Sequence, residues 1–305
     1  MRAARVGCFG VVALLASGMT AAADRDASPQ QAILVTGAST GIGRNVTEHL
    51  AGAGYFVYAG ARKDSDIKSL AAIRNVQAIR LDVTKPEEIA AAVAIVQKGG
   101  RGLYGLVNNA GIGSLDTTVG GSDAEFERVM AVNLFGPYRV TKAFAPLIIA
   151  TKGRITTIGS ISGVLASGIS GAYAMSKHAM EAFTDSLAQE LAPNGVLVSI
   201  IEPGTYNTEI SKNALARSSR DRHTPDRSMY PQPDDVSAAV RDALFSATPK
   251  RRYLVCPSES EAQVVIYKQL NQLVQLNEGQ RYTYDRPALI RMLDENLQGA
   301  RPRTK

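Results

Sequence analysis

The stretch Q-A-I-L-V-T-G-A-S-T-G-I-G (31–43) joins an apolar run, a glycine-rich turn and the start of a helical pattern. The apolar residues 31–35 are bounded by polar ones, which is typical of a strand buried in a parallel sheet. Glycines let the backbone turn tightly, and the N-terminus of the following helix, 42–51, presents free N–H groups to a phosphate. The stretch therefore predicts a dinucleotide site whose glycines are Gly37, Gly41 and Gly43.

Six further apolar runs alternate with stretches of helical spacing. They occupy residues 55–59, 76–81, 103–107, 154–158, 196–201 and 253–255. Strands that alternate with helices indicate an α/β fold, here a doubly wound, Rossmann-like parallel sheet of about seven strands. Ligands of such sheets bind beyond the carboxyl ends of the strands. We therefore expect one crevice to contain the residues that follow four of these strands, Thr36, Asp82, Asn108 and Ser160.

Short local patterns predict where helices begin and break. Residues 84–87 and 122–125 both have the capping-box pattern, a hydroxyl residue followed three positions later by Glu. Pro137 predicts a break or kink in the helical stretch that runs on to residue 149. Residues 205–233 are polar and contain three prolines, which predicts an irregular binding loop.

Two helical patterns, 261–276 and 287–297, follow the last strand. The first contains an apolar stripe, which predicts packing against the sheet, a partner subunit or the substrate mouth. The stripe consists of Val264, Val265, Leu270, Leu273 and Leu276.

Tyr173 and Lys177 lie four residues apart in a stretch with helical periodicity, 172–191, so they share one helix face. A phenol loses its proton near pH ~10, and an ammonium held beside it favours the phenolate and lowers that pKa. Such a phenol can give or take a proton near neutral pH. Ser160 ends a predicted strand, where its hydroxyl could hold a carbonyl or alcohol oxygen. Taken alone, the Tyr–Lys spacing would describe an ordinary surface pair.

The second predicted strand is followed by Gly60-Ala61-Arg62-Lys63. A site that prefers NAD places an acid here, to bind the ribose 2′-hydroxyl. No acid stands at that point, and Asp64 comes too late. Arg62 could instead meet a 2′-phosphate, which favours NADP(H) over NAD(H), unless Arg62 and Lys63 are ordinary loop cations.

Over residues 31–255 the sequence resembles the short-chain dehydrogenase/reductase family. The motifs are T-G-A-S-T-G-I-G (36–43), D-V (82–83), N-N-A-G (108–111), Asn133, Ser160, Y-x-x-x-K (173–177) and P-G-x-x-x-T (203–208). Within the family, the stretch V-N-L-F-G-P-Y-R-V-T-K-A-F (132–144) is most similar to the hydroxysteroid and retinol dehydrogenase type. Gly159 stands where many members have a second serine, which leaves Ser160 in place.

The resemblance implies a role for each matching residue. Tyr173 would be the general acid in reduction and the base in oxidation, Lys177 would assist it and bind the nicotinamide ribose, and Ser160 would polarise the substrate oxygen. Asn133 would hold a water that relays protons to Lys177. The implied cofactor contacts, besides Tyr173 and Lys177, are Thr36, Gly37, Ser39, Gly41, Ile42, Gly43, Arg62, Asp82, Val83, Asn108, Ala110, Gly111, Pro203, Gly204 and Thr208.

The sequence thus predicts an NADP(H)-dependent oxidoreductase that interconverts an alcohol and a ketone or aldehyde on a lipophilic, steroid- or retinoid-like substrate. A 3-oxoacyl thioester reductase is the alternative, because arginines at 217, 220, 222 and 227 could attract an anionic substrate or could simply be solvated. A non-catalytic nucleotide-sensing regulator is a third reading, against which the intact Ser160, Tyr173 and Lys177 argue. The resemblance also implies a homodimer or homotetramer.

Composition and the chain ends complete the prediction. The 305 residues, 45% hydrophobic and 20% charged, suit one large globular domain, or one domain with a tail. The resemblance implies a catalytic domain over 31–255, and the two helical patterns after it predict a C-terminal helical extension (256–305). The net charge of +6 comes without a basic run interleaved with aromatics, which argues against a nucleic-acid partner, and no metal-ligand cluster is visible. Residues 1–23 predict a cleaved export signal and a periplasmic protein, the alternative being a cytoplasmic protein that starts at Met19. Cleavage would leave Cys256 without a disulfide partner.

Overall fold

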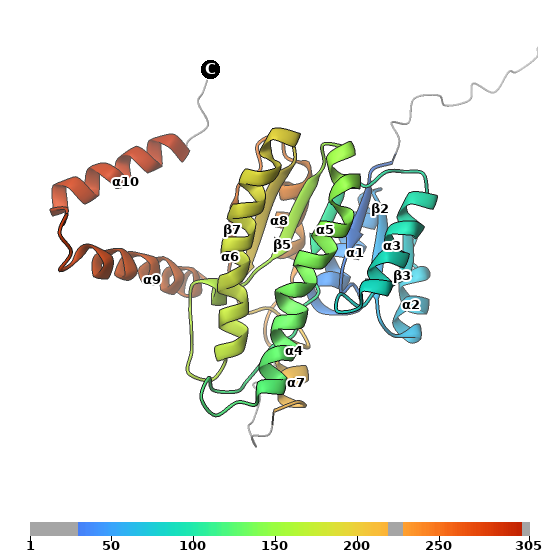
Figure 1. Ribbon diagram of the computed structural model, residues 1–305, viewed down its shortest axis with the longest axis horizontal. Helices are drawn as coiled ribbons and strands as arrows, with labels where there is room; N and C mark the ends of the chain where they lie inside the picture. Colours follow the sequence, from blue (N-terminus) through green and yellow to red (C-terminus); the bar gives the residue numbers. More distant parts are fainter. Residues whose placement is uncertain (1–29, 219–227, 301–305) are drawn as a thin grey trace, which may run out of the picture.

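The computed structural model describes residues 30–218 and 228–300, and a seven-stranded parallel sheet lies at its centre (Figure 1). The strands are β1 (Ala32–Val35), β2 (Phe56–Ala61), β3 (Val76–Arg80), β4 (Gly105–Asn108), β5 (Arg154–Ile158), β6 (Leu197–Pro203) and β7 (Arg252–Val255). Their order across the sheet is β3-β2-β1-β4-β5-β6-β7. The chain therefore winds outward from β1 in one direction and then in the other, which confirms the predicted doubly wound α/β sheet.

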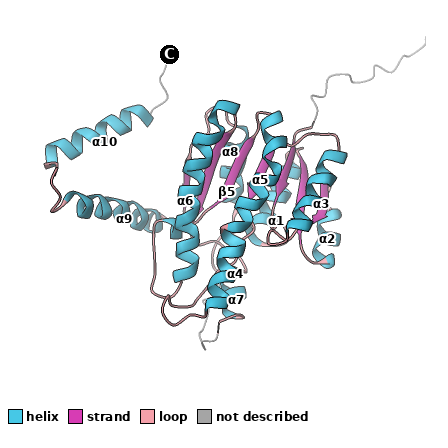
Figure 2. Ribbon diagram, viewed as in Figure 1, coloured by secondary structure: helices cyan, strands magenta, loops and turns pink. Residues whose placement is uncertain are grey.

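Helices cover both faces of the sheet (Figures 1 and 2). Along β1, Ala32 and Leu34 join a core with α3, α5 and α6, while Ile33 and Val35 join a second core with α1, α2 and α8. Successive side chains of a strand point to opposite faces, so a strand covered on both sides is apolar throughout. The helices of the described residues are α1 (Gly41–Gly52), α2 (Asp64–Ala71), α3 (Pro86–Lys98), α4 (Asp123–Asn133), α5 (Phe135–Ala150), α6 (Gly171–Leu191), α7 (Ile210–Leu215), α8 (Asp234–Phe245), α9 (Glu259–Asn277) and α10 (Arg286–Ala300).

One of the two predicted helix caps is confirmed and the other is wrong. The Ser122 hydroxyl caps α4 by accepting a hydrogen bond from the backbone N–H three residues on, at 3.2 Å. The N–H and hydroxyl of Thr84 instead donate to Asp82 Oδ1, at 2.9 and 2.7 Å. Pro86 then begins α3 one residue later than predicted, because proline at the first helical position gives up an N–H that has no partner there.

The break predicted near Pro137 is confirmed, and it falls at Leu134 between α4 and α5. Pro137 therefore lies in the first turn of α5, where a missing N–H costs no helical hydrogen bond. Two helices were not predicted, α2 and the short α7. The second lies inside the predicted irregular segment 205–233, whose residues 219–227 are outside the described part of the chain.

The helices α9 and α10 extend away from the sheet (Figure 1). Of the predicted apolar stripe, Val265 is buried, whereas Val264, Leu270, Leu273 and Leu276 are exposed. For those four residues the prediction of packing against the sheet is wrong, and contact with a partner subunit remains a prediction. Among the described residues, no helix has the length and apolar character needed to cross a bilayer. The predicted leader, residues 1–23, and the arginines at 220, 222 and 227 lie outside the described residues.

Candidate active site

A cavity of about 880 Å³ opens at the carboxyl ends of the central strands. It forms there because the parallel register brings strand ends level: Val35 pairs with Val107, and Ile158 with Ile201. Most of the predicted site residues line it, namely Gly37, Ser39, Gly41, Ile42, Gly43, Arg62, Asp82, Val83, Ala110, Gly111, Ser160, Tyr173, Lys177, Pro203, Gly204 and Thr208. Thr36, Asn108 and Asn133 are buried beneath this lining.

The glycine turn at the cofactor end packs directly against the loop that follows β4. Gly37 has φ 64°, and a Cβ added there would lie 2.8 Å from Ala110 Cα. A Cβ on Gly43 would overlap Gly37 O and Asn109 Nδ2. Only glycine fits such contacts, and the backbone it exposes can approach a pyrophosphate closely. The cradle therefore fits a dinucleotide, since α1 also begins here without an acid in its first turn to repel a phosphate.

Thr36 and Asn109 hold this cradle from below. The Thr36 hydroxyl oxygen accepts hydrogen bonds from Asn109 N and Ala110 N, both at 3.0 Å. Asn109 Nδ2 donates in turn to Thr36 O at 2.8 Å and Gly37 O at 3.0 Å. Asn109 also lines the cavity, whereas Asn108, the residue predicted to contact a ribose, donates to Thr141 Oγ1 at 2.9 Å beneath it. The sequence prediction missed Asn109, although it belongs to the same N-N-A-G motif.

Arg62 follows β2 directly and lines the cavity with its side chain 64% exposed. Its guanidinium Nη1 lies 4.0 Å from Asp82 Oδ2. Burial alone would raise the pKa of Asp82, but hydrogen bonds from Thr84 and the charges of Arg62 and Lys85 hold this pKa below its ordinary value. Asp64, the first acidic residue after β2, pairs with Arg80 and not with Arg62.

Tyr173 and Lys177 lie one turn apart near the start of α6, as predicted, and both line the cavity. Lys177 Nζ is 5.7 Å from the centroid of the Tyr173 ring and donates a hydrogen bond to Ile158 O at 2.8 Å. Burial lowers the pKa of Lys177 to about 8, and the charge of Glu181, one turn further along α6, opposes that shift. Ser160 Oγ accepts a hydrogen bond from Ser162 N at 3.0 Å, which orients the hydroxyl at the end of β5.

Asn133, the last residue of α4, forms hydrogen bonds with the backbone of the loop that follows β4. Its Oδ1 accepts from Ile112 N at 2.8 Å, and its Nδ2 donates to Ile112 O at 2.9 Å and to Ser176 Oγ at 3.0 Å. A Cβ on Gly111 would lie 3.5 Å from Asn133 Oδ1 and 3.9 Å from Lys177 Nζ. The end of α4 and the start of α6 therefore meet over Gly111, and the predicted water relay remains a prediction.

The loop after β6 forms the opposite side of the cavity, and α9 holds it. The Glu261 carboxylate accepts hydrogen bonds from Thr205 N at 3.0 Å and from the Thr205 hydroxyl at 2.6 Å. Three residues on, the Thr208 side chain lies against the glycine turn, 3.3 Å from where a Cβ on Gly41 would stand. No sequence motif links Glu261 to this loop, so its part in positioning Gly204 and Thr205 was not predicted.

This geometry agrees with what the sequence matches. The family model described as short chain dehydrogenase matches residues 31–219. The chain belongs to the short-chain dehydrogenase family. It is 33% identical over 232 residues to the uncharacterized oxidoreductase YbbO of Escherichia coli strain K12, a match that covers 74% of this chain and 86% of that protein.

For other members of the family, the match covers a smaller share of the relative's length. The D-beta-hydroxybutyrate dehydrogenase of Mus musculus mitochondria is 36% identical over 197 residues, 61% of this chain and 57% of that protein. The match thus spans little more than half the length of that relative. Estradiol 17-beta-dehydrogenase 2 of Mus musculus is 35% identical, over 68% of this chain and 55% of that protein. Among solved structures, an actinorhodin polyketide ketoreductase with NADPH has a TM-score of 0.68 at 27% identity, covering 75% of this chain and 96% of that one.

Proposed function

We propose that this short-chain dehydrogenase is an NADP(H)-dependent oxidoreductase that interconverts an alcohol and a ketone or aldehyde. The observation that carries the proposal is the buried Lys177 beside Tyr173, in a cavity that also contains Ser160 and the glycine cradle. Burying an ammonium is costly, so a merely structural contact with Ile158 O is a weak reason to keep it there. The Lys177 ammonium instead has a chemical role, because its charge favours the phenolate of the neighbouring Tyr173.

The chain's own residues handle the proton and the substrate oxygen. In reduction, the Tyr173 hydroxyl donates its proton to the carbonyl oxygen as that oxygen gains negative charge, and the Ser160 hydroxyl donates a hydrogen bond to the same atom. In oxidation Tyr173 accepts the proton. Lys177 remains mostly charged at neutral pH, because its pKa is about 8. The bound nicotinamide would supply or accept the hydride.

The preference for NADP(H) rests on Arg62. It is the first side chain after β2, at the edge of the cavity, where an NAD-preferring site has an acid. The 2′-phosphate would add a charge-assisted contact that NADH cannot make. The polyketide ketoreductase of similar structure is named with NADPH, which supports the same preference.

A lipophilic, uncharged carbonyl is the substrate class we propose. The cavity lining near α7 and the loop before α6 includes the apolar Ile112, Leu115, Ile169, Ile210 and Ala214, which could contact a lipophilic substrate. The same part of the lining also contains polar side chains, among them Ser114, Ser167, Ser211 and Asn213. Estradiol and retinol dehydrogenases among the relatives support this class. The ketoreductase supports a 3-oxoacyl thioester as the alternative. That alternative relied partly on Arg217, whose guanidinium already pairs with Glu125.

A substrate screen with both cofactors tests the proposal. Steroid ketones, retinal, acetoacetate and a 3-oxoacyl thioester would each be offered with NADPH and with NADH, following nicotinamide absorbance. We expect turnover of an uncharged lipophilic carbonyl, faster with NADPH. Turnover restricted to the thioester would favour the alternative substrate class. Tight cofactor binding with no turnover of any carbonyl or alcohol would favour a nucleotide-sensing regulator.

We also propose a homo-oligomer, for which the surface offers support. Large apolar side chains are exposed on α4, α5 and α6, among them Phe126, Phe135, Tyr138 and Met175. Clustered exposed apolar residues mark contact surfaces more often than isolated ones do. Light scattering on the purified chain would measure the molar mass, and a monomer of 32.4 kDa would refute the proposal.

A further inference from the structure

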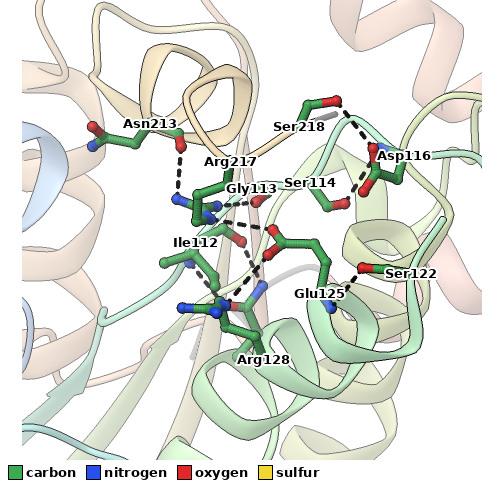
Figure 3. A network of polar contacts seen from close by, with 11 residues as sticks. Ile112, Gly113, Ser114, Asp116, Ser122, Glu125, Arg128, Asn213, Arg217 and Ser218 are labelled. Carbon is green, nitrogen blue, oxygen red and sulfur yellow. Dashed lines mark hydrogen bonds and ion pairs between the residues drawn. The ribbon is translucent and has the colours of Figure 1, made fainter. Parts of the chain in front are cut away.

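A buried carboxylate, Glu125, is paired with two arginines beside the cavity (Figure 3). It belongs to the first turn of α4, and its side chain is only 10% exposed. Arg217 Nε lies 3.2 Å from its Oε1, and Arg128 Nε lies 3.4 Å from its Oε2. Arg217 is the better shielded partner, with a side chain 24% exposed against 60% for Arg128.

Arg217 reaches two further acceptors besides Glu125. Its Nη2 donates to Gly113 O, in the loop after β4, and its Nη1 donates to Asn213 O in α7, both at 2.7 Å. The guanidinium therefore joins α4, the loop after β4 and the segment that contains α7. All its terminal nitrogens contribute to this contact, which a planar fork of five donors makes possible.

Close packing accompanies these polar contacts. A Cβ on Gly113 would lie 3.3 Å from Ala214 Cβ and equally close to Ile210, so the loop and α7 touch at this glycine. The neighbouring Ile112 is fixed from the other end of α4 by Asn133. Part of the cavity lining comes from these two segments, and we call these residues the substrate wall: Ile112, Gly113, Ser114, Leu115, Ile210, Ser211, Asn213, Ala214, Ala216 and Arg217.

A shielded ion pair of this kind differs from a solvated surface pair. Removing one partner would leave a buried charge unpaired, which disturbs the structure much more than losing an exposed pair. The chain offers an exposed pair for comparison on α7 itself, Lys212 with Glu209, whose side chains are 78% and 49% exposed. That pair joins residues of the same segment and ties α7 to nothing else.

We propose that Glu125 and Arg217 are positioning residues that fix the substrate wall, and that the wall so fixed selects uncharged carbonyl substrates. The selection part rests on the proposed function. Arg217 also lines the cavity, but its guanidinium is paired with Glu125 and hydrogen-bonded to Gly113 O and Asn213 O, which leaves little of its charge for an anionic substrate. The wall presents the apolar Ile112, Leu115, Ile210 and Ala214 to the cavity, together with the uncharged polar Ser114, Ser211 and Asn213.

Hydrogen–deuterium exchange on the full chain tests the wall without relying on any activity. In Arg217→Met, the amides of 112–118 and 210–217 should exchange roughly tenfold faster or more, while those of β4 and α6 keep their rates. Lys212→Met is the matched control, since it removes a cation from α7 without touching Glu125, and should leave both segments unchanged. Unchanged exchange in Arg217→Met would overturn the proposal, whether or not a substrate is known.

Kinetics then test the selection. Arg217→Met should raise the KM for an uncharged carbonyl about tenfold with kcat within about twofold, and leave NADPH binding unaltered. Combining Glu125→Gln with Arg217→Met should lose no more than the larger single change, because both remove one shared contact. A loss confined to anionic thioesters would mean that Arg217 binds substrate, and additive losses would mean that the two residues act separately. Either result overturns the proposal, whereas a wild type without turnover refutes the proposed function and leaves the exchange result valid.

Discussion

The two ends of the cavity are built in different ways. At the cofactor end, backbone meets backbone: the glycine turn rests on the loop after β4, and Gly37 and Gly43 leave no space for a side chain. At the substrate end, side chains join segments far apart in the chain, and Arg217 reaches a carbonyl 104 residues away. A backbone cradle tolerates few substitutions, whereas a side-chain wall can be altered without rebuilding the sheet. Substitutions at the cofactor end should therefore disturb the turn itself, whereas substitutions at the substrate end should change substrate selection with less effect on the fold.

The largest expected effect lies where the two ends meet, at Tyr173. Tyr173→Phe keeps the ring but removes the proton, so kcat should fall about 10³-fold, within the range that general acid–base catalysis contributes. NADPH affinity, measured by fluorescence titration, should change little, because the cradle is untouched. Tyr282→Phe is the control, since that tyrosine is 66% exposed on the loop between α9 and α10. Unchanged turnover in Tyr173→Phe would refute the catalytic assignment.

A substitution in the cradle should act on the cofactor alone. In Gly43→Ala the new Cβ would overlap Gly37 O and Asn109 Nδ2, and the turn would have to move. Overpacking of this kind costs roughly 1–3 kcal/mol of folding stability when it is not relieved. If the turn moves instead and loses about 2 kcal/mol of its contacts with the pyrophosphate, the Kd for NADPH rises about 30-fold. Gly52→Ala provides a control in the same helix, since no atom lies within 4 Å of its added Cβ. Equal affinity in both variants would show that the turn does not contact the cofactor.

The same contrast explains what the sequence could predict. The glycine turn and the Tyr173–Lys177 pair are local patterns, readable within one loop or one helical turn. The contact between Arg217 and Glu125 joins residues 92 positions apart, so no local sequence pattern predicts it. Asn108, the last residue of β4, is buried beneath the cavity, whereas Asn109 lines it, because adjacent residues of an extended chain point to opposite sides.

The missed helix α2 has a different cause. Its eight residues contain two large apolar side chains, Ile67 and Leu70, of which Leu70 is buried, too few for a visible period. Tertiary packing against the sheet, rather than a strong sequence pattern, accounts for this helix. By contrast α6, predicted over residues 172–191, is observed at Gly171–Leu191, within one residue of the prediction.

Lys177 lies where the cofactor end and the substrate end of the cavity meet, and we expect its buried ammonium to lower the stability of the fold. Its pKa of about 8 lies below the ordinary 10.5, so above pH 8 the unfolded chain holds a proton that the folded chain has lost. Stability from this group therefore rises between pH 8 and 10.5, and below pH 8 the buried charge costs on the order of 3 kcal/mol. Replacing Lys177 would remove this cost but would also lose its hydrogen bond to Ile158 O, which stabilises the fold by about 1 kcal/mol.

Lys177→Met should therefore raise the free energy of unfolding at pH 7 by about 2 kcal/mol, while abolishing most turnover. Urea titrations at pH 7 and pH 10 would measure the effect, and the gain should shrink at the higher pH. A difference in unfolding free energy between variant and wild type that is the same at both pH values, or a variant less stable than wild type at pH 7, would show that the ammonium carries no such cost.

The smallest expected effect concerns the exposed edge of the cofactor end, at Arg62. Because its side chain is 64% exposed, solvent screens its charge, and a 2′-phosphate contact is worth about tenfold in affinity. Arg62→Ala should thus weaken NADPH about tenfold and NADH less than about twofold. Lys68→Ala, on the exposed side of α2 and outside the cavity lining, removes the same charge as a control.

If Arg62 contacts the 2′-phosphate, one side chain at the cofactor end can be changed without disturbing the glycine cradle. In this respect Arg62 resembles the side chains of the substrate wall. The ratio of NADPH to NADH affinities isolates that contact, because pyrophosphate and ribose contacts cancel in it. A ratio unchanged by Arg62→Ala, or changed equally by Lys68→Ala, would reduce Arg62 to a general surface charge and leave cofactor choice to the backbone.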